Sequence, residues 1–274
     1  MKQLSGKVAV ITGAAGGIGS ALAMELANAG MDIVLADIDV QSMEDLAEKI
    51  TSLNQRCICF ETNVSEFSHI QRLLDHTLAS LGDCHLLINN AGIIRAAGLF
   101  SVDFQRWQQV IDVNLNGVLY GSRVFGEYFI SKKEGHIVNV SSAAALFPMP
   151  GMTMYTTSKI AVESFTMQLR WELHQKGVGV TLARPGTTKS KIYEGPQVGL
   201  PRAQANRVTQ MALRPEGLAR KIRRAVQHNR ARVSSGAEVY LFGLLRLLPM
   251  WLKDPIGKLI ARTTLKMLPQ KQID

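Results

Sequence analysis

The chain has 274 residues, of which 46% are hydrophobic and 19% are charged. This balance is that of a folded globular protein, and it excludes an intrinsically disordered chain and a fibre. The length favours a single α/β domain with an appendage, because one domain of this size can bury a sizeable core.

The formal net charge of +9 lies mostly in the C-terminal quarter. Residues 200–274 hold 15 Lys or Arg and 4 Asp or Glu, a net of +11, so residues 1–199 carry 16 minus 18, or −2. A basic block of this kind suits nucleic acid, an anionic membrane surface or an acidic substrate carrier, and composition alone does not choose among them.

The first strand-like run begins a few residues after Met1, which leaves no room for a secretory signal. We therefore expect a cytoplasmic protein, with membrane association through its C-terminal end as an alternative. The three cysteines form neither an even disulfide set nor paired CxxC motifs, and the histidines show no ligand spacing. We expect no metal site.

Short β-branched runs alternate with helical patterns through the first 185 residues. Segments such as SALAMELANAG, with apolar residues at three- and four-residue spacing, predict the helices. The runs between them are apolar on both faces, so the pattern predicts a doubly wound parallel α/β sheet with helices on both faces. The expected strands are 8–12, 31–37, 57–61, 85–90, 136–142 and 178–183.

Glycine and proline interrupt this alternation at PMPGM (148–152) and repeatedly between 185 and 201, where Gly195, Pro196 and Pro201 stand. We expect residues 1–236 to form the domain, with a substrate-binding loop over about 187–215. Residues 237–274 are expected to form an apolar and basic C-terminal helical extension.

The motif TGAAGGIG (12–19) follows the first strand and opens the first helix. Gly13 would permit the tight turn, Gly17 a close approach to a pyrophosphate, and Gly19 close packing of the helix, whose N-terminus could then receive phosphates. A glycine-rich turn can also be no more than a turn, but its place between strand and helix favours a dinucleotide site.

Asp37 ends the second strand, 18 residues after Gly19, where a carboxylate can accept hydrogen bonds from an adenosine ribose. Such a carboxylate repels the 2′-phosphate of NADP, and no Arg or Lys lies at 14–17 or just after Asp37 to neutralise it. The sequence therefore predicts NAD as the cofactor and makes NADP less suitable. The alternative is a solvated acid at a strand end.

Tyr155 and Lys159 stand four residues apart in a predicted helix, so they share one face. A nearby ammonium favours a phenolate and would lower the pKa of Tyr155, which makes the tyrosine a candidate general acid or base. Such a pair is more often a helix-surface contact. Ser142, at the end of the fifth predicted strand, supports the catalytic interpretation because its hydroxyl could hold a substrate oxygen.

The order and spacing of these motifs resemble those of the short-chain dehydrogenase/reductases. The likeness runs from about residue 7 to 186 and more loosely to 236, and it implies a Rossmann-type fold and an NAD(P)-dependent oxidoreductase. The motifs that carry it are TGAAGGIG, NNAG (89–92), Asn114 in IDVNLNG, Ser142 in NVSS, YTTSK (155–159) and PG (185–186).

The resemblance implies a role for each of four residues. Tyr155 would exchange a proton with the substrate oxygen, and Ser142 would orient and polarise that oxygen. Lys159 would bind the nicotinamide ribose and lower the tyrosine pKa. Asn114 would anchor a water molecule that relays protons from Lys159 to solvent.

Two cofactor positions depart from the family pattern. Ser190 stands where relatives usually have threonine after the PG pair, and Asn63 stands where they have an acidic residue before a valine. Serine keeps a hydroxyl, and the Asn63 oxygen could still bind the adenine amino group. The resemblance places the cofactor against Gly13, Gly16, Gly17, Ile18, Gly19, Asp37, Ile38, Asn63, Val64, Asn90, Ala91, Gly92, Tyr155, Lys159, Pro185, Gly186, Thr188 and Ser190.

We expect an NAD-dependent oxidoreductase that interconverts a secondary alcohol and a ketone on a hydrophobic substrate of steroid, retinoid, terpenoid or acyl type. A 3-oxoacyl-carrier reductase is the alternative within this class, since an acidic carrier could use the basic C-terminal quarter. A non-catalytic dinucleotide-sensing scaffold is the alternative from another class. Flexible thioethers suit an adaptable pocket, so Met149, Met152 and Met154 could contact substrate.

We also expect a homodimer or homotetramer. No nucleic-acid partner is expected, because the Arg-rich segment 214–233 lacks the aromatic residues of single-strand platforms and suits a helix that flanks the sheet.

Residues 238–270 suggest a peripheral membrane contact. The apolar run VYLFGLLRLLPMWL has 14 residues and contains Arg246 and Pro249, so it is shorter than the ~20 residues that a membrane span needs. In the next helical pattern Ile256, Leu259, Ile260 and Met267 share one face, and Lys258, Arg262 and Lys266 lie on a neighbouring face. The alternative is that this segment covers the substrate cleft or a neighbouring subunit.

Overall fold

A computed structural model of the protein describes residues 1–101, 103–193, 198–199 and 202–268. Gly195, Pro196 and Pro201 of the expected substrate loop lie outside these ranges. The end of the expected extension, residues 269–274, also lies outside them.

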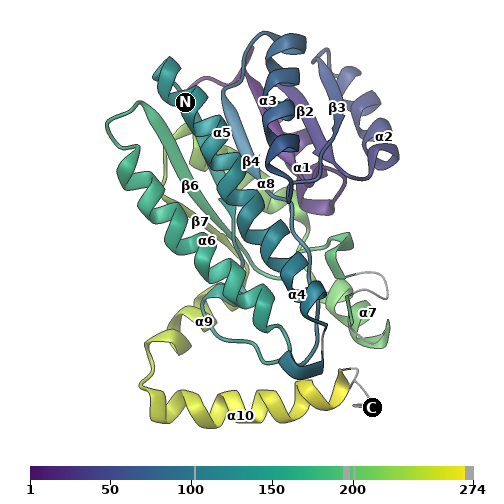
Figure 1. The fold of residues 1–274 in the computed structure, drawn as a ribbon, viewed down its shortest axis with the longest axis vertical. Coiled ribbons are helices and arrows are strands. Elements are labelled where there is room, and N and C mark those ends of the chain that lie inside the picture. Colours follow the sequence, from purple (N-terminus) through teal and green to yellow (C-terminus); the bar gives the residue numbers. More distant parts are fainter. Residues whose placement is uncertain (102, 194–197, 200–201, 269–274) are drawn as a thin grey trace.

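The described chain builds one parallel sheet of seven strands in the order β3-β2-β1-β4-β5-β6-β7 (Figure 1). The strand order reverses between β1 and β4, which pair side by side, and ligands of such sheets bind at this switch point. The predicted doubly wound sheet is confirmed. The strands are β1 Val8–Thr12, β2 Asp32–Asp37, β3 Cys57–Glu61, β4 Leu86–Asn89, β5 Gly135–Val140, β6 Val178–Pro185 and β7 Arg232–Ser235.

Helices cover both faces of this sheet, as the apolar runs predict. The α-helices are α1 Gly17–Ala27, α2 Val40–Thr51, α3 Phe67–Leu81, α4 Phe104–Ile111, α5 Gly117–Lys132, α6 Thr153–Glu172, α7 Arg202–Met211, α8 Pro215–Gln227, α9 Ala237–Leu247 and α10 Met250–Met267. The shorter helices are η1 Leu99–Ser101, η2 Asp112–Asn116, η3 Ala143–Ala145 and η4 Lys191–Tyr193.

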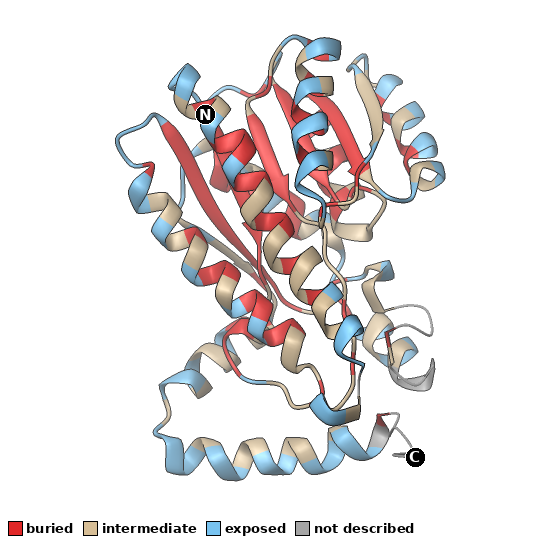
Figure 2. Cartoon of the chain, in the orientation of Figure 1, coloured by how far each residue is buried: buried red, intermediate tan, exposed pale blue. Residues whose placement is uncertain are grey.

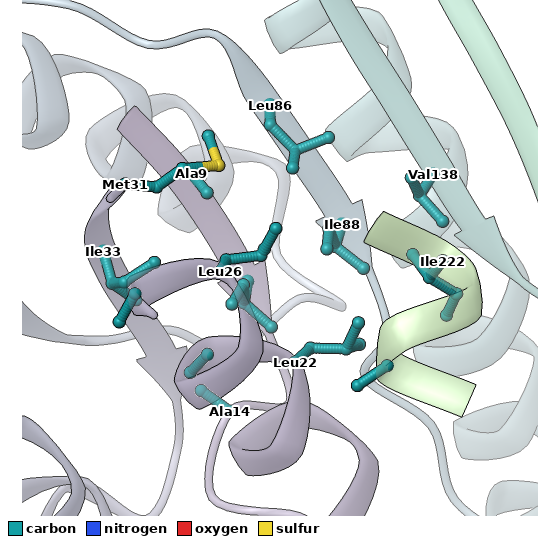
Figure 3. Close-up of a cluster of buried hydrophobic side chains, with 14 of the residues drawn as sticks. Ala9, Ala14, Leu22, Leu26, Met31, Ile33, Leu86, Ile88, Val138 and Ile222 are labelled. Carbon is teal, nitrogen blue, oxygen red and sulfur yellow. The ribbon is translucent and has the colours of Figure 1, made fainter. Parts of the chain in front are cut away.

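Alternate residues of each central strand enter two separate cores. In β1, Ala9 and Ile11 pack with α1, α2 and α8, whereas Val8 and Val10 pack with α3 and α5. Figure 3 shows the first core, where Leu22 of α1 and Ile222 of α8 meet the strands. Because both faces are covered, the central strands are buried along their length (Figure 2).

Two parts of the chain differ from the sequence prediction. Strand β7 was not expected, because RVSS has a single β-branched apolar residue, Val233; it pairs with β6 at the edge of the sheet. The expected loop over about 187–215 contains two helices, η4 and α7, and so is partly helical. The C-terminal extension is helical, as expected, and its helix α10 lies across the end of the molecule at which the strands end (Figure 1).

Candidate active site

A cavity of about 450 Å³ opens at the carboxyl ends of the strands. It brings together residues that the sequence places far apart, including Asp37, Ser142 and Tyr155. Asn114, Gly17 and Gly19 do not line it. The predicted residues that do line it are Gly13, Gly16, Ile18, Asp37, Ile38, Asn63, Val64, Asn90, Ala91, Gly92, Ser142, Tyr155, Lys159, Pro185, Gly186, Thr188 and Ser190.

The glycine-rich turn forms one end of this cavity. Gly13 has a φ of 67°, and a Cβ at Gly19 would collide with the Gly13 carbonyl oxygen, so the turn and the start of α1 require glycine at both places. Gly16, the N-cap of α1, makes no side-chain cap bond, which leaves the first N–H groups of the helix for another acceptor. This end fits a phosphate.

Gly17 has a second function that its motif does not reveal. A Cβ there would collide with the Lys189 carbonyl oxygen, so glycine allows the segment after β6 to cross over the start of α1. Ser190 lies in this segment and lines the cavity, and its hydroxyl accepts from the Ile192 N–H at 3.4 Å. Thr188 is buried, and its hydroxyl donates to the Gly186 carbonyl oxygen.

The Asp37 carboxylate is held at the far corner of the cavity. Its Oδ2 accepts from the Ala15 N–H at 3.0 Å and its Oδ1 from the Asp39 N–H at 3.2 Å. The segment after β6 brings a cation to the same corner: Lys191 Nζ donates to Ser42 Oγ at 3.1 Å and lies 4.0 Å from Asp39 Oδ2. Sequence reasoning missed Lys191, because it searched for cations only next to the glycine turn and Asp37.

Asn90 and Asn63 both use their side chains to hold the backbone around the cavity. The Asn90 amide donates to the carbonyl oxygens of Thr12 and Gly13, which fastens β4 to the glycine-rich turn. Asn63 Oδ1 accepts from the backbone N–H and the hydroxyl of Ser65. The oxygen expected to meet adenine therefore already caps the turn before α3.

Ser142, Tyr155 and Lys159 meet at the other end of the cavity. Lys159 is buried on α6, donates from Nζ to the Val140 carbonyl oxygen at 3.0 Å, and lies 5.9 Å from the centre of the Tyr155 ring. Ser142 starts η3, and its Oγ accepts from the Ala144 N–H at 3.1 Å. The ammonium, the phenol and the hydroxyl thus share one site, as the sequence predicted.

The expected lowering of the Tyr155 pKa is wrong for the protein as described. Burial raises the pKa of Tyr155, and the hydrogen bond with the Ser142 hydroxyl lowers it by less. Burial also lowers the pKa of Lys159 to about 8. Desolvation of the phenol outweighs this hydrogen bond, because a phenolate loses more stabilisation by leaving water than the Ser142 hydroxyl restores.

Asn114 lies beneath the cavity, fully buried in the π-helical turn η2. Its Oδ1 accepts from the Ile93 N–H at 2.8 Å, and its Nδ2 donates to the Ile93 carbonyl oxygen at 3.0 Å and to Ser158 Oγ at 3.2 Å. A Cβ added at Gly92 would lie 3.2 Å from Asn114 Oδ1 and 3.5 Å from Lys159 Nζ, so the amide and the ammonium flank the same glycine. Single π turns of this kind often mark functional sites.

A buried ion pair supports α6 from below. Arg184 at the end of β6 donates two hydrogen bonds of 2.6 Å to the Glu163 carboxylate on α6. Ser141 Oγ donates to the Lys159 carbonyl oxygen at 3.0 Å and lies 3.3 Å from Glu163 Oε1. Sequence reasoning missed this pair, although Glu163 follows Lys159 by four residues and Arg184 is a charge inside an apolar strand, which is a usable signal.

Apolar side chains surround Tyr155 on its other side. Sequence reasoning also missed Tyr193 of η4, which lines the cavity and whose pKa is raised by burial, by Tyr155 and by Glu238. Met152 and Met154 pack in the same apolar cluster as Tyr155, whereas Met149 does not belong to it. The cluster comprises Ile93, Ile94, Val110, Ala144, Met152, Met154, Tyr155, Ile192, Tyr193 and Val198.

This arrangement agrees with the comparison with known families. The protein-family model described as short chain dehydrogenase matches residues 7–196 of this chain. The chain belongs to the short-chain dehydrogenase family. As a short-chain dehydrogenase it is an oxidoreductase, and its relatives cover most of its length. The protein named as the oxidoreductase SadH of Mycobacterium tuberculosis is 31% identical over 276 residues, 98% of this chain and 99% of SadH.

Other relatives extend the likeness to a named activity and to solved structures. The 3-oxoacyl-[acyl-carrier-protein] reductase FabG of Thermotoga maritima is 33% identical over 192 residues, 70% of this chain and 78% of FabG. A short chain dehydrogenase/reductase from Burkholderia phymatum, solved in complex with NAD, is 31% identical with a TM-score of 0.86, over 92% of this chain and 97% of that one. A metagenomic short-chain oxidoreductase in complex with NADP is 28% identical with a TM-score of 0.72, over 85% and 97%.

The buried ammonium generates a stability prediction. Lys159 loses its proton near pH 8 when folded and at 10.5 when unfolded, so between these values the unfolded chain binds more protons and the group's contribution to stability rises with pH. Lys159→Met lacks this gain. Relative to wild type, its free energy of unfolding should fall by up to about 1.4 kcal/mol per pH unit from pH 8 upward and stay level below pH 7.

Urea unfolding of both proteins across this pH range measures the difference. The control is Lys176→Met, which changes an exposed lysine just after the end of α6. Its free energy of unfolding should follow that of wild type across the pH range. A Lys159→Met difference that is independent of pH would contradict the lowered pKa.

Proposed function

We propose that the protein is an NAD-dependent oxidoreductase that interconverts a secondary alcohol and a ketone on a hydrophobic substrate. The observation that carries this proposal is the meeting of the Tyr155 phenol, the Lys159 ammonium and the Ser142 hydroxyl in the cavity that also holds Asp37 and the start of α1. A cofactor bound between these ends would place a reactive ring beside a proton donor.

The proposed proton chemistry is divided among four side chains. Tyr155 gives its proton to the substrate oxygen during reduction and takes it back during oxidation. Ser142 hydrogen-bonds the same oxygen and orients it. Lys159 contacts the ribose of the cofactor and holds a positive charge beside the phenol, and Asn114, on the other side of Gly92, anchors the water that carries protons to solvent. When bound, the nicotinamide supplies the hydride exchange.

The residues of the cavity fit a dinucleotide. The free N–H groups at the start of α1 and the Ser190 hydroxyl would hold the pyrophosphate, and the anchored Asp37 carboxylate would accept from the adenosine ribose. We propose NAD rather than NADP on the charge of Asp37. Lys191 offsets part of that charge, because it lies near Asp39 in the same corner, so the preference should be moderate.

The apolar side chains around Tyr155 support a hydrophobic substrate of steroid, retinoid, terpenoid or acyl type. We propose that Met152, Met154 and Tyr193 contact it. Tyr193 keeps its proton because its pKa is raised, so it can donate a hydrogen bond to a second polar group of the substrate. A homodimer or homotetramer forms part of this proposal.

A 3-oxoacyl-carrier reductase is the alternative that a specific relationship favours, since FabG is among the relatives. The basic C-terminal quarter would suit an acidic carrier protein. The comparison to make is kcat/KM for a 3-oxoacyl group on its carrier against the same group as a small thioester. A large gain on the carrier would favour the reductase. A dinucleotide-sensing scaffold would instead bind NAD and show no turnover on any alcohol or ketone of a broad panel.

Tyr155→Phe tests the catalytic assignment. The ring is kept and only the transferable proton is lost, so kcat should fall by roughly 10²- to 10⁴-fold while NAD binding stays close to wild type. Steady-state kinetics on a verified substrate and calorimetric NAD binding measure the two effects. The matched control is Tyr128→Phe, which removes a hydroxyl that bonds Asp83 away from the cavity and should keep its kcat. Retention of most of the kcat by Tyr155→Phe would remove Tyr155 from the mechanism.

Asp37→Ala tests the cofactor assignment. The ratio of kcat/KM with NAD to that with NADP should fall by about 10- to 100-fold, because hydrogen bonds to a charged group contribute roughly 1.5–3 kcal/mol. Adding Lys191→Gln should reverse much of the gain with NADP, since it removes the cation at that corner. Asp45→Ala, on the exposed side of α2, is the control. A wild-type enzyme that already prefers NADP would overturn the assignment to NAD.

A further inference from the structure

The outer side of helix α9 is apolar and lies open to solvent. Its inner side is fixed: Glu238 accepts from the Thr187 N–H, and Val239 and Phe242 pack against η3 and Phe147. The side chains opposite are left uncovered and continue into the start of α10. We name as the C-terminal apolar face the residues Tyr240, Leu241, Leu244, Leu247, Met250 and Trp251, which are 55% to 80% exposed.

Helix α10 adds positive charge beside this face. Lys258, Arg262 and Lys266 follow at four-residue spacing and are exposed, with Leu259 between them, whereas Ile256 and Ile260 are half-buried on the opposite side. Residues 237–268 hold 5 Lys or Arg and 2 Asp or Glu, a net of +3. One of the two acids, Glu238, is turned inward to Thr187, and the other, Asp254, forms an exposed ion pair of 2.6 Å with Lys258. Of the three spaced cations, this leaves Arg262 and Lys266 as those that no acid of this segment pairs in the described structure.

We propose that the C-terminal apolar face and the cations of α10 dock the protein onto an anionic lipid surface. Apolar side chains that enter the headgroup boundary, with cations near the headgroups, are the two requirements for an interfacial helix, and Trp251 and Tyr240 are ring types favoured at that depth. In the described part of the chain, no helix is long and apolar enough to span a bilayer. The contact is therefore peripheral.

Charge favours lipid over a second copy of the chain as the occupant. A two-fold contact between copies would bring this surface against itself, and the excess of Lys and Arg would then face its own repeat. An anionic membrane supplies the opposite charge along the whole surface. The two helices also expose the aromatic rings of Tyr240 and Trp251, which the polar surface of an acidic carrier protein would not cover.

Docking here would face the substrate region toward the membrane. The end of α10 packs beside Gly151, where an added Cβ would collide with the Leu268 side chain and lie 3.2 Å from Thr264. Met152, the next residue, belongs to the apolar cluster around Tyr155. A hydrophobic substrate could thus pass from the lipid to the cavity; this consequence rests on the proposed function, whereas the docking does not.

Vesicle co-sedimentation of the full chain tests the docking. Wild type should sediment with phosphatidylcholine vesicles that contain phosphatidylglycerol at low salt, and less with phosphatidylcholine alone. The variant K258Q/R262Q/K266Q should bind the anionic vesicles about 100-fold more weakly, since each cation near the surface contributes roughly 1 kcal/mol. The variant L244S/L247S/W251S should lose binding to both. Trp171→Ser, which removes a tryptophan that is 68% exposed at the far end of α6, should bind like wild type.

Circular dichroism checks that the variants fold, which the exposure of all six side chains leads us to expect. The proposal is overturned if wild type stays in the supernatant with anionic vesicles at low salt, or if L244S/L247S/W251S binds as wild type does. Light scattering without lipid measures the oligomeric state of wild type and of this variant. An oligomer that L244S/L247S/W251S breaks would make this face a contact between copies and would also overturn the proposal. None of these outcomes depends on turnover, so each is independent of the proposed function.

Discussion

The hydrogen bond from the Lys159 ammonium to the Val140 carbonyl oxygen fixes α6 against the end of β5. A buried cation is costly, and because burial lowers the pKa of Lys159 to about 8, this hydrogen bond offsets only part of that cost. Ser141 binds the Lys159 carbonyl oxygen, and the ion pair of Glu163 with Arg184 joins the next turn of α6 to β6. The helix cannot turn or slide without breaking these bonds, and the catalytic tyrosine that we propose is carried on it.

A second network joins the two halves of the sheet at the same level. The Asn89 amide at the end of β4 donates to Asn139 Oδ1 in β5, whose own amide donates to Thr166 on α6. Asn90, one residue further, donates to the backbone of Thr12 and Gly13 at the end of β1. The glycine-rich turn and helix α6 are thus connected through β4 and β5 by side-chain amides. The two ends of the cavity are held at a fixed separation by the protein itself.

The sequence was sufficient for features that depend on local patterns. Apolar β-branched runs predict six of the strands, and the glycine turn, Asp37 and the Tyr155 to Lys159 spacing predict residues at both ends of the cavity, because each is written within one short segment. The family resemblance, rather than any local pattern, implied the other predicted residues that line it. The missed features depend on tertiary contact. Strand β7 gains its place from pairing with β6 rather than from its residues, and Lys191 reaches Asp39 only because the segment after β6 crosses α1. The tyrosine pKa was misjudged because spacing reveals the neighbouring charge but not the depth of burial.

The protonation of the site bears on the direction in which it works. With the pKa of Tyr155 raised and that of Lys159 near 8, both groups carry their protons at neutral pH, so under the proposed function Tyr155 would be ready to protonate a substrate oxygen. This favours carbonyl reduction. Oxidation needs a phenolate, which burial disfavours, and it should gain as pH rises until Lys159 loses the charge that would stabilise that anion. An enzyme that uses NAD for oxidation would thus need the bound cofactor and substrate to offset the desolvation of Tyr155, because the hydroxyl of Ser142 alone does not.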